Sequence, residues 1–304
     1  MTTSIETKVF RIAHISDLHF STFTWSPTQF FSKRWVGNAN LLFRRMKEFC
    51  HSQLNELTQV FIEKKIDLLI VTGDLSTTSK KNEFLLAQAF LNKIKNAGVE
   101  VITLPGNHDH YTKLDYKNQT FYDFFKSSIS KSEDIFSDIN LKDQKISVKK
   151  LPDGYWLVAL DTSLATPLLS CHGNFSEQIE DSLRKVLTSI ADEDKVILAN
   201  HFPIFTSDSK HKHLLRDNAL RQVLSEFPKV KVYLHGHTHR HSIADLRNAG
   251  LPIILDSGCT SHKKKGSWNL LELNKQTCKI TSYSLAKQDQ SNGWKERSTV
   301  SFTI

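Results

Sequence analysis

Short apolar runs recur along the chain, and each one ends in a block of polar residues. The runs are Phe10 to Ser16, Asp67 to Thr72, Val99 to Leu104, Lys195 to Ala199 and Val230 to Leu234. Their length and their β-branched residues predict buried β-strands. Between the runs, apolar residues recur at helical spacing and predict amphipathic helices. These helices span about 39–64, 82–97, 176–190 and 214–226.

Alternating strands and helices indicate βαβ units and therefore an α/β fold with parallel strands. In open α/β sheets, ligands bind outside the carboxyl ends of the strands. The polar blocks all follow strands at that end. They are Asp17-Leu18-His19, Gly73-Asp74, Gly106-Asn107-His108-Asp109, His201 and Gly236-His237-Thr238-His239. The sequence therefore predicts one site, assembled from five separate stretches of chain.

The chain is expected to form a single domain over residues 1–304, although its 304 residues could hold two. A boundary anywhere between Asp17 and His239 would divide the predicted site. The core is expected at about 10–240. Three later runs predict further strands, which would add a mostly antiparallel sheet over about 251–304. These runs are Leu251 to Asp256, Ser267 to Leu273 and Cys278 to Leu285.

The net charge of +8 suggests an anionic partner, but the lysines are scattered in short groups that are typical of solvated faces. The groups are Lys64-Lys65, Lys80-Lys81, Lys149-Lys150 and Lys263-Lys264-Lys265. Nothing matches a helix-turn-helix, RNA-recognition or zinc-finger signature, so no specific nucleic-acid binding is expected.

The cysteines and the hydropathy pattern favour a cytoplasmic protein. Cys50, Cys171, Cys259 and Cys278 lie far apart with no C-x-x-C pair, as is usual for thiols in a reducing compartment. Residues 1–10 lack a basic start followed by an apolar stretch. No run reaches the roughly 18 apolar residues that would span a bilayer.

The donor set at the strand ends predicts a catalytic pair of metal ions. Carboxylate oxygens and imidazole nitrogens without thiolate suit Mn, Fe or Zn and differ from the ligands of a structural zinc site. Two ions about 3.5–4 Å apart clamp a displacement at phosphorus and need a bridging ligand. Asp74 is the candidate bridge, because a carboxylate has two oxygens. If the strand continues, Asp17 and His19 point to one face, and the spacing of His237 and His239 places both imidazoles on one side.

In this order, the blocks resemble the calcineurin-like metallophosphoesterase superfamily, whose pattern is D-x-H, G-D, G-N-H-D/E, H, G-H-x-H. The resemblance covers residues 10 to about 240. It implies a four-layer α/β/β/α sandwich of two mixed β-sheets. It also implies a first metal held by Asp17, His19, Asp74 and His239, and a second held by Asp74, Asn107, His201 and His237. By the same likeness, His108 donates a hydrogen bond or proton to the phosphoryl or leaving oxygen, and Asp109 orients it.

Five other residues near the blocks have both a structural and a functional interpretation. His14, inside an apolar strand, is expected to be a core histidine, and His235 either packs in the core or orients a ligand. His110 and Tyr111 directly follow the Asn-His-Asp block and either line the substrate pocket or pack beneath it. His172 lies in a loop that could reach the pocket.

The resemblance favours a binuclear-metal phosphodiesterase of small nucleotide-like substrates, and class III cyclic-nucleotide phosphodiesterases are the nearest likeness. Gly173 before a helix and the segment Asn200-His201-Phe202-Pro203 resemble that branch. The arginine that often follows Asn-His-Asp there is replaced by His110. The alternative enzyme is a pyrophosphatase resembling UDP-2,3-diacylglucosamine hydrolases, whose commonest form has arginine at the position of His108. The alternative from another class is a non-catalytic, metal-bound scaffold subunit.

Residues 20–49 interleave aromatic and basic side chains directly after two of the predicted metal ligands. The aromatics include Phe23, Trp25, Phe30, Phe31 and Trp35, and the basic residues include Lys33, Arg34, Arg44, Arg45 and Lys47. Such a segment can bind a nucleotide base, a lipid-linked substrate or a membrane surface, or it can pack on the core. It is the stretch through which a peripheral membrane contact is expected.

Overall fold

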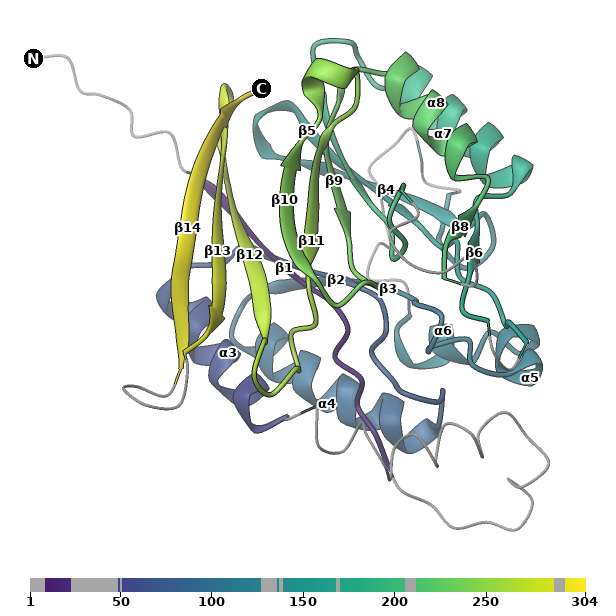
Figure 1. The fold of residues 1–304 in the computed structure, drawn as a ribbon, viewed down its shortest axis with the longest axis vertical. Coiled ribbons are helices and arrows are strands. Elements are labelled where there is room, and N and C mark those ends of the chain that lie inside the picture. The colour runs from purple at the N-terminus through teal and green to yellow at the C-terminus, as the bar shows by residue number, and fades with distance from the viewer. Residues whose placement is uncertain are drawn as a thin grey trace, which may run out of the picture.

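Two six-stranded β-sheets form the centre of the protein (Figure 1). The structure is a computed structural model, and it describes residues 9–22, 49, 51–126, 136, 139–167, 170–205, 212–286 and 293–304. Both sheets are mixed: the strands of the predicted βαβ units pair in parallel, and antiparallel strands lie at one edge of the first sheet and at both edges of the second. This arrangement confirms the α/β class and the two mixed sheets.

The first sheet has the order β14-β13-β12-β1-β2-β3. Its strands are β1 (Phe10–Ile15), β2 (Leu68–Thr72), β3 (Glu100–Leu104), β12 (Ser267–Leu273), β13 (Thr277–Leu285) and β14 (Trp294–Thr303). β1, β2 and β3 pair in parallel, and β12 joins β1 in antiparallel register. The sheet therefore combines the first strands of the chain with the last.

The second sheet has the order β10-β11-β9-β7-β5-β4. Its strands are β4 (Ile146–Leu151), β5 (Tyr155–Leu160), β7 (Lys195–Ala199), β9 (Val230–His235), β10 (His241–Asp245) and β11 (Ile253–Ser257). β5, β7, β9 and β11 run parallel, and β4 and β10 close the two edges in antiparallel register. A further pair, β6 (Gly173–Asn174) and β8 (Leu214–Leu215), forms a small separate ribbon.

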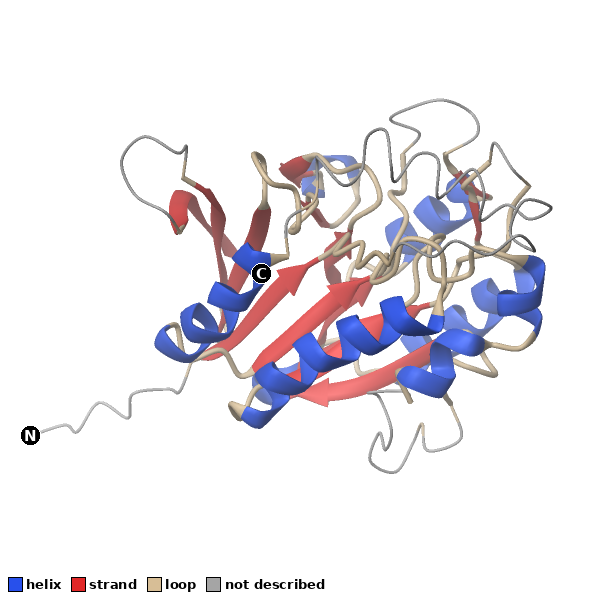
Figure 2. Ribbon diagram, turned by 90° about the horizontal axis from the view of Figure 1, so that it is seen from below, coloured by secondary structure: helices blue, strands red, loops and turns tan. Residues whose placement is uncertain are grey.

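Helices cover the outer faces of both sheets, which gives the expected four layers. They are α3 (Ser52–Glu63), α4 (Lys81–Asn96), α5 (Lys113–Lys117), α6 (Thr120–Phe124), α7 (Glu177–Ser189) and α8 (Asp217–Glu226), with short 3-10 turns at Pro152–Gly154 and Arg247–Ala249. Figure 2 shows helices in front of the first sheet and loops gathered beyond the arrowheads of its strands. Within the described residues, no helix is long and apolar enough to cross a bilayer.

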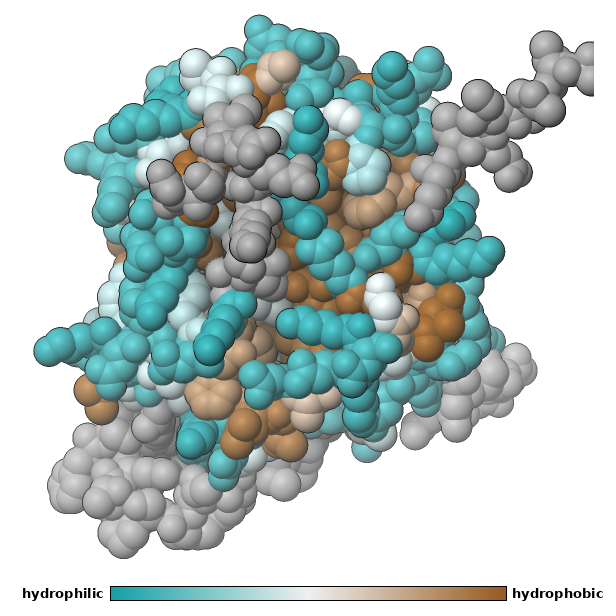
Figure 3. All heavy atoms as spheres, turned by 180° about the vertical axis from the view of Figure 1, so that it is seen from behind, coloured by the Kyte–Doolittle hydropathy of each residue, from teal (hydrophilic) through white to brown (hydrophobic). Residues whose placement is uncertain are grey.

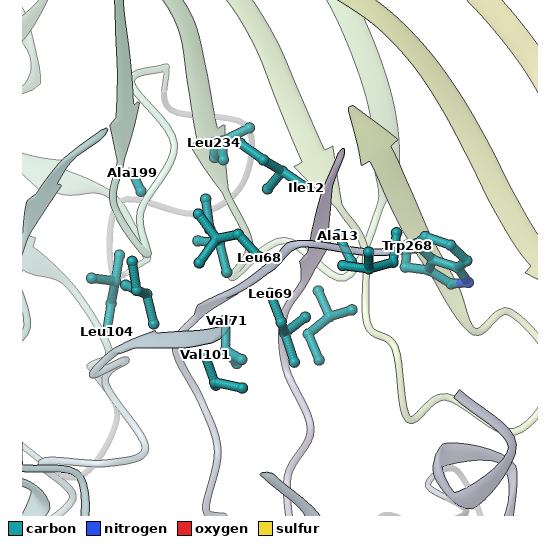
Figure 4. Close-up of a cluster of buried hydrophobic side chains, with 14 of the residues drawn as sticks. Ile12, Ala13, Leu68, Leu69, Val71, Val101, Leu104, Ala199, Leu234 and Trp268 are labelled. Carbon is teal, nitrogen blue, oxygen red and sulfur yellow. The ribbon is translucent and has the colours of Figure 1, made fainter. Parts of the chain in front are cut away.

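The strands of the second sheet are buried on both faces, which explains their continuous apolar runs. In β7, Ile197 and Ala199 join the core between the two sheets, and Val196 and Leu198 join the core under α7 and α8. Figure 4 shows Ala199 and Leu234 of the second sheet in the same cluster as Ile12 and Leu68 of the first. The rear face of the molecule is mainly hydrophilic, with hydrophobic side chains interspersed (Figure 3).

Most of the predicted elements are confirmed. The strands at 195–199 and 267–273 agree residue for residue, and the helix predicted at 82–97 is α4, displaced by one residue. Only part of the helix predicted at 39–64 lies in the described residues, where α3 begins at Ser52. The helix predicted from 214 begins at Asp217, because Arg216 adopts a left-handed φ of 61° and Leu214–Leu215 form β8.

The prediction of a separate C-terminal sheet is wrong. β11 pairs in parallel with β9 in the second sheet, and β12 to β14 extend the first sheet from β1. The hydrophobic pattern marks a strand but carries no information on its partner, so this division could not be read from it. The hydrophobic pattern also does not predict four further strands, which are β4, β5, β10 and β14. The single-domain organisation stays a prediction.

We expect Trp268→Ala to lower the free energy of unfolding by about 3–5 kcal/mol, because it leaves a large cavity in the core. Trp268 is fully buried, stacks on Tyr283 at 4.3 Å between ring centroids and meets Phe61 edge-on. Denaturant titration measures the change. The control is Val300→Ala on the exposed strand β14, where the loss should be below about 0.5 kcal/mol. Equal losses would show that Trp268 is not a packing centre.

Candidate metal centre

All five polar blocks lie at the carboxyl ends of parallel strands, as predicted. Asp17 and His19 follow β1, Asp74 follows β2, and Asn107 follows β3. His201 follows β7, and His237 and His239 follow β9. The first sheet therefore supplies the carboxylates and the second sheet supplies most of the imidazoles. The site forms only when the two sheets pack face to face.

The backbone at the site is strained. Five of the seven predicted metal ligands have a left-handed backbone, with φ of 57° at Asp17, 46° at His19, 54° at Asp74, 69° at His237 and 58° at His239. Such conformations cost free energy for any residue other than glycine and often occur at functional sites. The left-handed φ values also correct the expectation that Asp17 and His19, like His237 and His239, lie on a continuing strand. Each strand ends before its ligands.

Hydrogen bonds between loops hold this strained backbone. The N–H of Asp17 donates to the carbonyl of Gly73 at 3.0 Å, and the N–H of His19 donates to the carbonyl of Asp74 at 2.9 Å. On the other side, the thiol of Cys259 and the hydroxyl of Ser261 donate to the carbonyl of Asp17 at 3.1 and 3.0 Å. The loop after β1 is therefore fixed from both sides.

The first predicted ligand set comes together around Asp17, His19 and His239. Nε2 of His239 lies 3.0 Å from Nε2 of His19 and 3.1 Å from Oδ1 of Asp17. Nε2 of His19 lies 3.6 Å from the same carboxylate oxygen. Asp17 and His19 are fully buried. Three electron-pair donors therefore converge on one small volume.

The second set comes together around Asn107, His201 and His237. Oδ1 of Asn107 lies 3.0 Å from Nδ1 of His237 and 3.2 Å from Nε2 of His201. Nδ1 of His201 faces the carbonyl of Thr72 at 2.7 Å. Because a carbonyl only accepts, Nδ1 of His201 carries the proton and Nε2 presents its lone pair to the cluster.

Asp74 lies between the two sets. Its Oδ2 is 3.8 Å from Nε2 of His19 and its Oδ1 is 3.5 Å from Nε2 of His201. One carboxylate therefore directs one oxygen toward each cluster, as expected of a bridging ligand. His237 and His239 do not share a side: His237 joins the second set and His239 the first.

The electrostatics of these donors suit cations. Burial lowers the pKa of His201, and it lowers that of His237 to about 3, so both imidazoles stay neutral at neutral pH. Burial of Asp17 acts to raise its pKa, but His239, His201 and His19 together hold that pKa well below the usual range. No described residue donates a hydrogen bond to the buried Oδ1 of Asp17. A buried anionic oxygen beside several imidazole nitrogens fits a divalent ion.

His108 lies beside the first cluster and Asp74. Its ring meets that of His19 edge-on at 5.0 Å between centroids, and it stacks on Tyr111 at 5.6 Å. Its Nδ1 is 2.7 Å from the carbonyl of Thr77, so Nδ1 is the donor there. Proton transfer by His108 would therefore use Nε2.

Asp109 acts differently from the role that the resemblance implied. Its carboxylate accepts hydrogen bonds from the N–H groups of Leu75, Ser76 and Gly106, at 3.1, 2.8 and 2.9 Å, and one from the hydroxyl of Ser76. These bonds fasten the loop after β2 to the loop after β3. The group at Nδ1 of His108 is the Thr77 carbonyl, so Asp109 positions the histidine through the backbone. Burial raises the pKa of Asp109 to about 6.

The remaining histidines are mostly structural. Nε2 of His14 pairs with the hydroxyl of Thr72 at 3.0 Å inside the core, as expected. His235 is buried with Nδ1 3.0 Å from the carbonyl of Gly236. His110 is buried against Tyr116 and faces Asp161 at 3.7 Å, so it packs beneath the loop. Nδ1 of His172 lies 2.5 Å from the hydroxyl of Ser170.

Two residues at the site were not singled out from the sequence. Asp256 accepts hydrogen bonds from the hydroxyl of Thr238 and from the N–H of Gly258, and so anchors the loop that carries His237 and His239. Phe49 places its ring 4.7 Å from that of His19 and 6.1 Å from that of His239. An acidic residue at the end of β11 could have indicated Asp256, whereas Phe49 had no signal apart from the aromatic content of residues 20–49. Residues 23–48 lie outside the described residues.

Comparison with known proteins agrees with this geometry. The family model described as calcineurin-like phosphoesterase matches residues 10–241. The 3',5'-cyclic adenosine monophosphate phosphodiesterase CpdA of Escherichia coli is 24% identical over 225 residues, which cover 70% of this chain and 72% of CpdA. The probable glycerophosphodiester phosphodiesterase GpdQ of Arcobacter nitrofigilis is 23% identical over 206 residues, covering 66% of each chain.

Two solved structures share the fold. A dimetal phosphatase from Danio rerio aligns with a TM-score of 0.65 at 14% identity and covers 97% of this chain and 99% of its own. The purple acid phosphatase PPD1 from yellow lupin aligns with a TM-score of 0.61 at 12% identity and covers 98% of this chain and 54% of its own. At these identities the likeness concerns the fold alone.

We expect Gly106→Ala to reduce the metal content of the purified protein and to lower activity by roughly 10²-fold or more, because small displacements at a reacting centre have effects of that size. A β-carbon at Gly106 would lie 2.2 Å from Oδ1 of Asp74 and 2.5 Å from the Asp74 nitrogen. Elemental analysis measures the metal content. The control is Gly98→Ala, where a β-carbon meets nothing within 4 Å and only the left-handed φ of 88° is unfavourable, so that it adds backbone strain away from Asp74. Full metal content in the Gly106 variant would contradict the bridging role of Asp74.

Proposed function

The chain belongs to the calcineurin-like phosphoesterase family, and from that premise we propose that it is a phosphodiesterase of small, nucleotide-like substrates. Membership makes it a metal-dependent hydrolase of phosphoric esters. The observation that carries the proposal is the pair of donor clusters joined by Asp74, with His108 beside them. We propose Mn, Fe or Zn as the metals, because mixed oxygen and nitrogen donors suit these ions.

Each cluster fits one ion. The first would be held by Asp17, His19, Asp74 and His239, and the second by Asp74, Asn107, His201 and His237. When bound, two divalent ions neutralise the phosphoryl oxygens and lower the pKa of an attacking water. The residues of this chain would fix where the phosphorus lies, because their loops are fastened by hydrogen bonds before substrate arrives.

His108 is placed to assist departure of the leaving group. Its Nδ1–H donates to the carbonyl of Thr77, which fixes the ring plane. The second nitrogen can then donate a proton to the oxygen that leaves phosphorus. Tyr111 stacks on the ring and limits its rotation.

The relatives support a diester substrate. The names of CpdA and GpdQ denote phosphodiesterases, one of a cyclic nucleotide and one of glycerophosphodiesters. His108 supports the same choice over the pyrophosphatase alternative, whose commonest form has arginine at this position. The complete set of predicted ligands favours an enzyme over a scaffold subunit, because a scaffold has no need of two donor clusters joined by one carboxylate.

We expect the Mn-loaded protein to hydrolyse bis-p-nitrophenyl phosphate and cyclic AMP faster than p-nitrophenyl phosphate or a UDP-linked lipid, as measured by kcat/KM. Asp74→Asn is the negative control. It keeps the shape of the side chain but removes the charge shared by two cations, so every activity should disappear together with the second metal. Preference for the monoester or for the UDP-linked lipid would contradict the proposal.

We expect His108→Ala to leave both metals bound and to lower kcat by roughly 10²–10⁴, the usual range for loss of a positioned proton donor. The loss should be larger for poor alkoxide leaving groups than for nitrophenolate, which departs without a proton. Steady-state kinetics with both ester types provide the comparison. Equal losses for both types would assign His108 to stabilising the phosphoryl charge instead of to proton donation.

A further inference from the structure

The turn between β11 and β12 carries three consecutive lysines, Lys263, Lys264 and Lys265, all of them exposed. The described part of the chain gives none of them a carboxylate partner. Lys149 and Lys279, by contrast, pair with Glu100 and Glu272. Three uncompensated positive charges therefore occupy one short turn.

The turn is attached directly to the metal centre. Thr260 donates its N–H to the carbonyl of Ser16 at 3.0 Å, and the hydroxyl of Ser261 donates to the carbonyl of Asp17 at 3.0 Å. Only His262 separates Ser261 from Lys263. Residue 262 also forms an isolated antiparallel bridge with Phe49, whose ring lies 4.7 Å from that of His19. The lysines therefore stand on the side of the site formed by Asp17, His19 and His239.

The backbone of the turn is held in place before any ligand binds. The N–H groups of Lys264 and Lys265 donate to Nδ1 of His262 at 3.1 and 3.2 Å. The side-chain amide of Gln53, near the start of α3, donates to the carbonyls of Thr260 and His262 at 3.1 and 3.2 Å. Figure 1 shows this connection beyond the lower ends of β11 and β12, on the side of α3. Charges on a fixed turn bind an anion at a smaller entropic cost than charges on a mobile one.

We propose that Lys263, Lys264 and Lys265 form a subsite for a second anionic group of the substrate, next to the first metal cluster. The inference rests on the proposed phosphodiesterase function. The scissile phosphate occupies the metal centre, and a further phosphate on the same molecule meets the lysines. The substrate class is therefore a small phosphodiester that bears an additional phosphate. A cyclic mononucleotide has a single phosphate and makes no use of this subsite.

The charge pattern supports separate binding sites for the scissile phosphate and the further phosphate. Lysine ammonium groups are flexible point charges that bind phosphate without demanding one geometry. Positive charge at the rim of a cleft also raises the local concentration of an anionic substrate and its association rate. Because the lysines are remote from the reacting phosphorus, they bind the ground state and the transition state equally. They therefore lower KM without changing kcat.

The test compares two esters that differ by one phosphate: thymidine 5'-(p-nitrophenyl phosphate) and the same ester carrying a 3'-phosphate. We expect the wild-type protein to show a KM roughly 3- to 20-fold lower for the 3'-phosphorylated ester, because charge pairs that are exposed to water each contribute little. The triple variant K263Q/K264Q/K265Q should remove this difference and leave kcat unchanged. The advantage should also decrease as salt is added.

The control variant K64Q/K65Q/K95Q removes the same charge from exposed positions at the amino ends of β2 and β3, opposite the site. It should keep the wild-type preference. Equal KM for the two esters in the wild-type protein, or equal loss of preference in both triple variants, would overturn the subsite. Hydrolysis of both esters without preference would leave the phosphodiesterase function standing, whereas absence of any diester hydrolysis would refute that function.

Binding provides a readout that does not depend on turnover. The Kd of thymidine 3',5'-bisphosphate should be lower than that of thymidine 5'-phosphate for the wild-type protein, and the two should be equal for K263Q/K264Q/K265Q. Flotation with anionic phosphatidylserine vesicles tests whether the lysines bind the phosphate of a lipid headgroup instead. Vesicle binding that the lysine substitutions abolish, with both Kd values unchanged, would assign the turn to a membrane surface and overturn the subsite.

Discussion

The carboxylate of Asp74 lies between two groups of electron-pair donors, and the rest of the structure serves to hold those donors close to it. One oxygen faces His19 and the other faces His201, from opposite sheets. A cation lying among these donors would satisfy all of them at once. The two sheets, their loops and the glycines next to Asp74 therefore hold a donor set that suits bound positive charge.

That requirement explains where the backbone is strained. The ligands with left-handed φ occur where strands end and the chain must turn sharply to point a side chain inward. Gly106 and Gly236 allow the loops to approach without collision, since a β-carbon at Gly236 would lie 2.5 Å from Oδ2 of Asp17. Strain of this kind persists because the surrounding hydrogen bonds determine the conformation from several directions.

The C-terminal strands contribute more to the site than the family match at 10–241 indicates. Asp256 anchors the loop between His237 and His239, and Cys259 and Ser261 bind the carbonyl of Asp17. β12 places this segment against β1, because it pairs with that strand along its length. The part of the chain beyond the matched region therefore supports the first metal cluster and forms one wall of its approach.

The sequence alone predicted the donor residues, the strand ends that carry them and the α/β class, because each of these follows from residue type and local periodicity. Residues that follow an apolar run are expected at the carboxyl end of a strand. Asp74, Asn107 and His201 lie at such ends. The sequence also marked strands such as 267–273 correctly.

Only the tertiary structure decided which groups meet across the two sheets. It gave the ring of His108 the Thr77 carbonyl as its partner and turned Asp109 toward the backbone of two loops. It also joined β12 to β1 and β11 to β9. These contacts depend on strand pairing between distant segments and on left-handed turns, and neither leaves a periodic signal in the sequence.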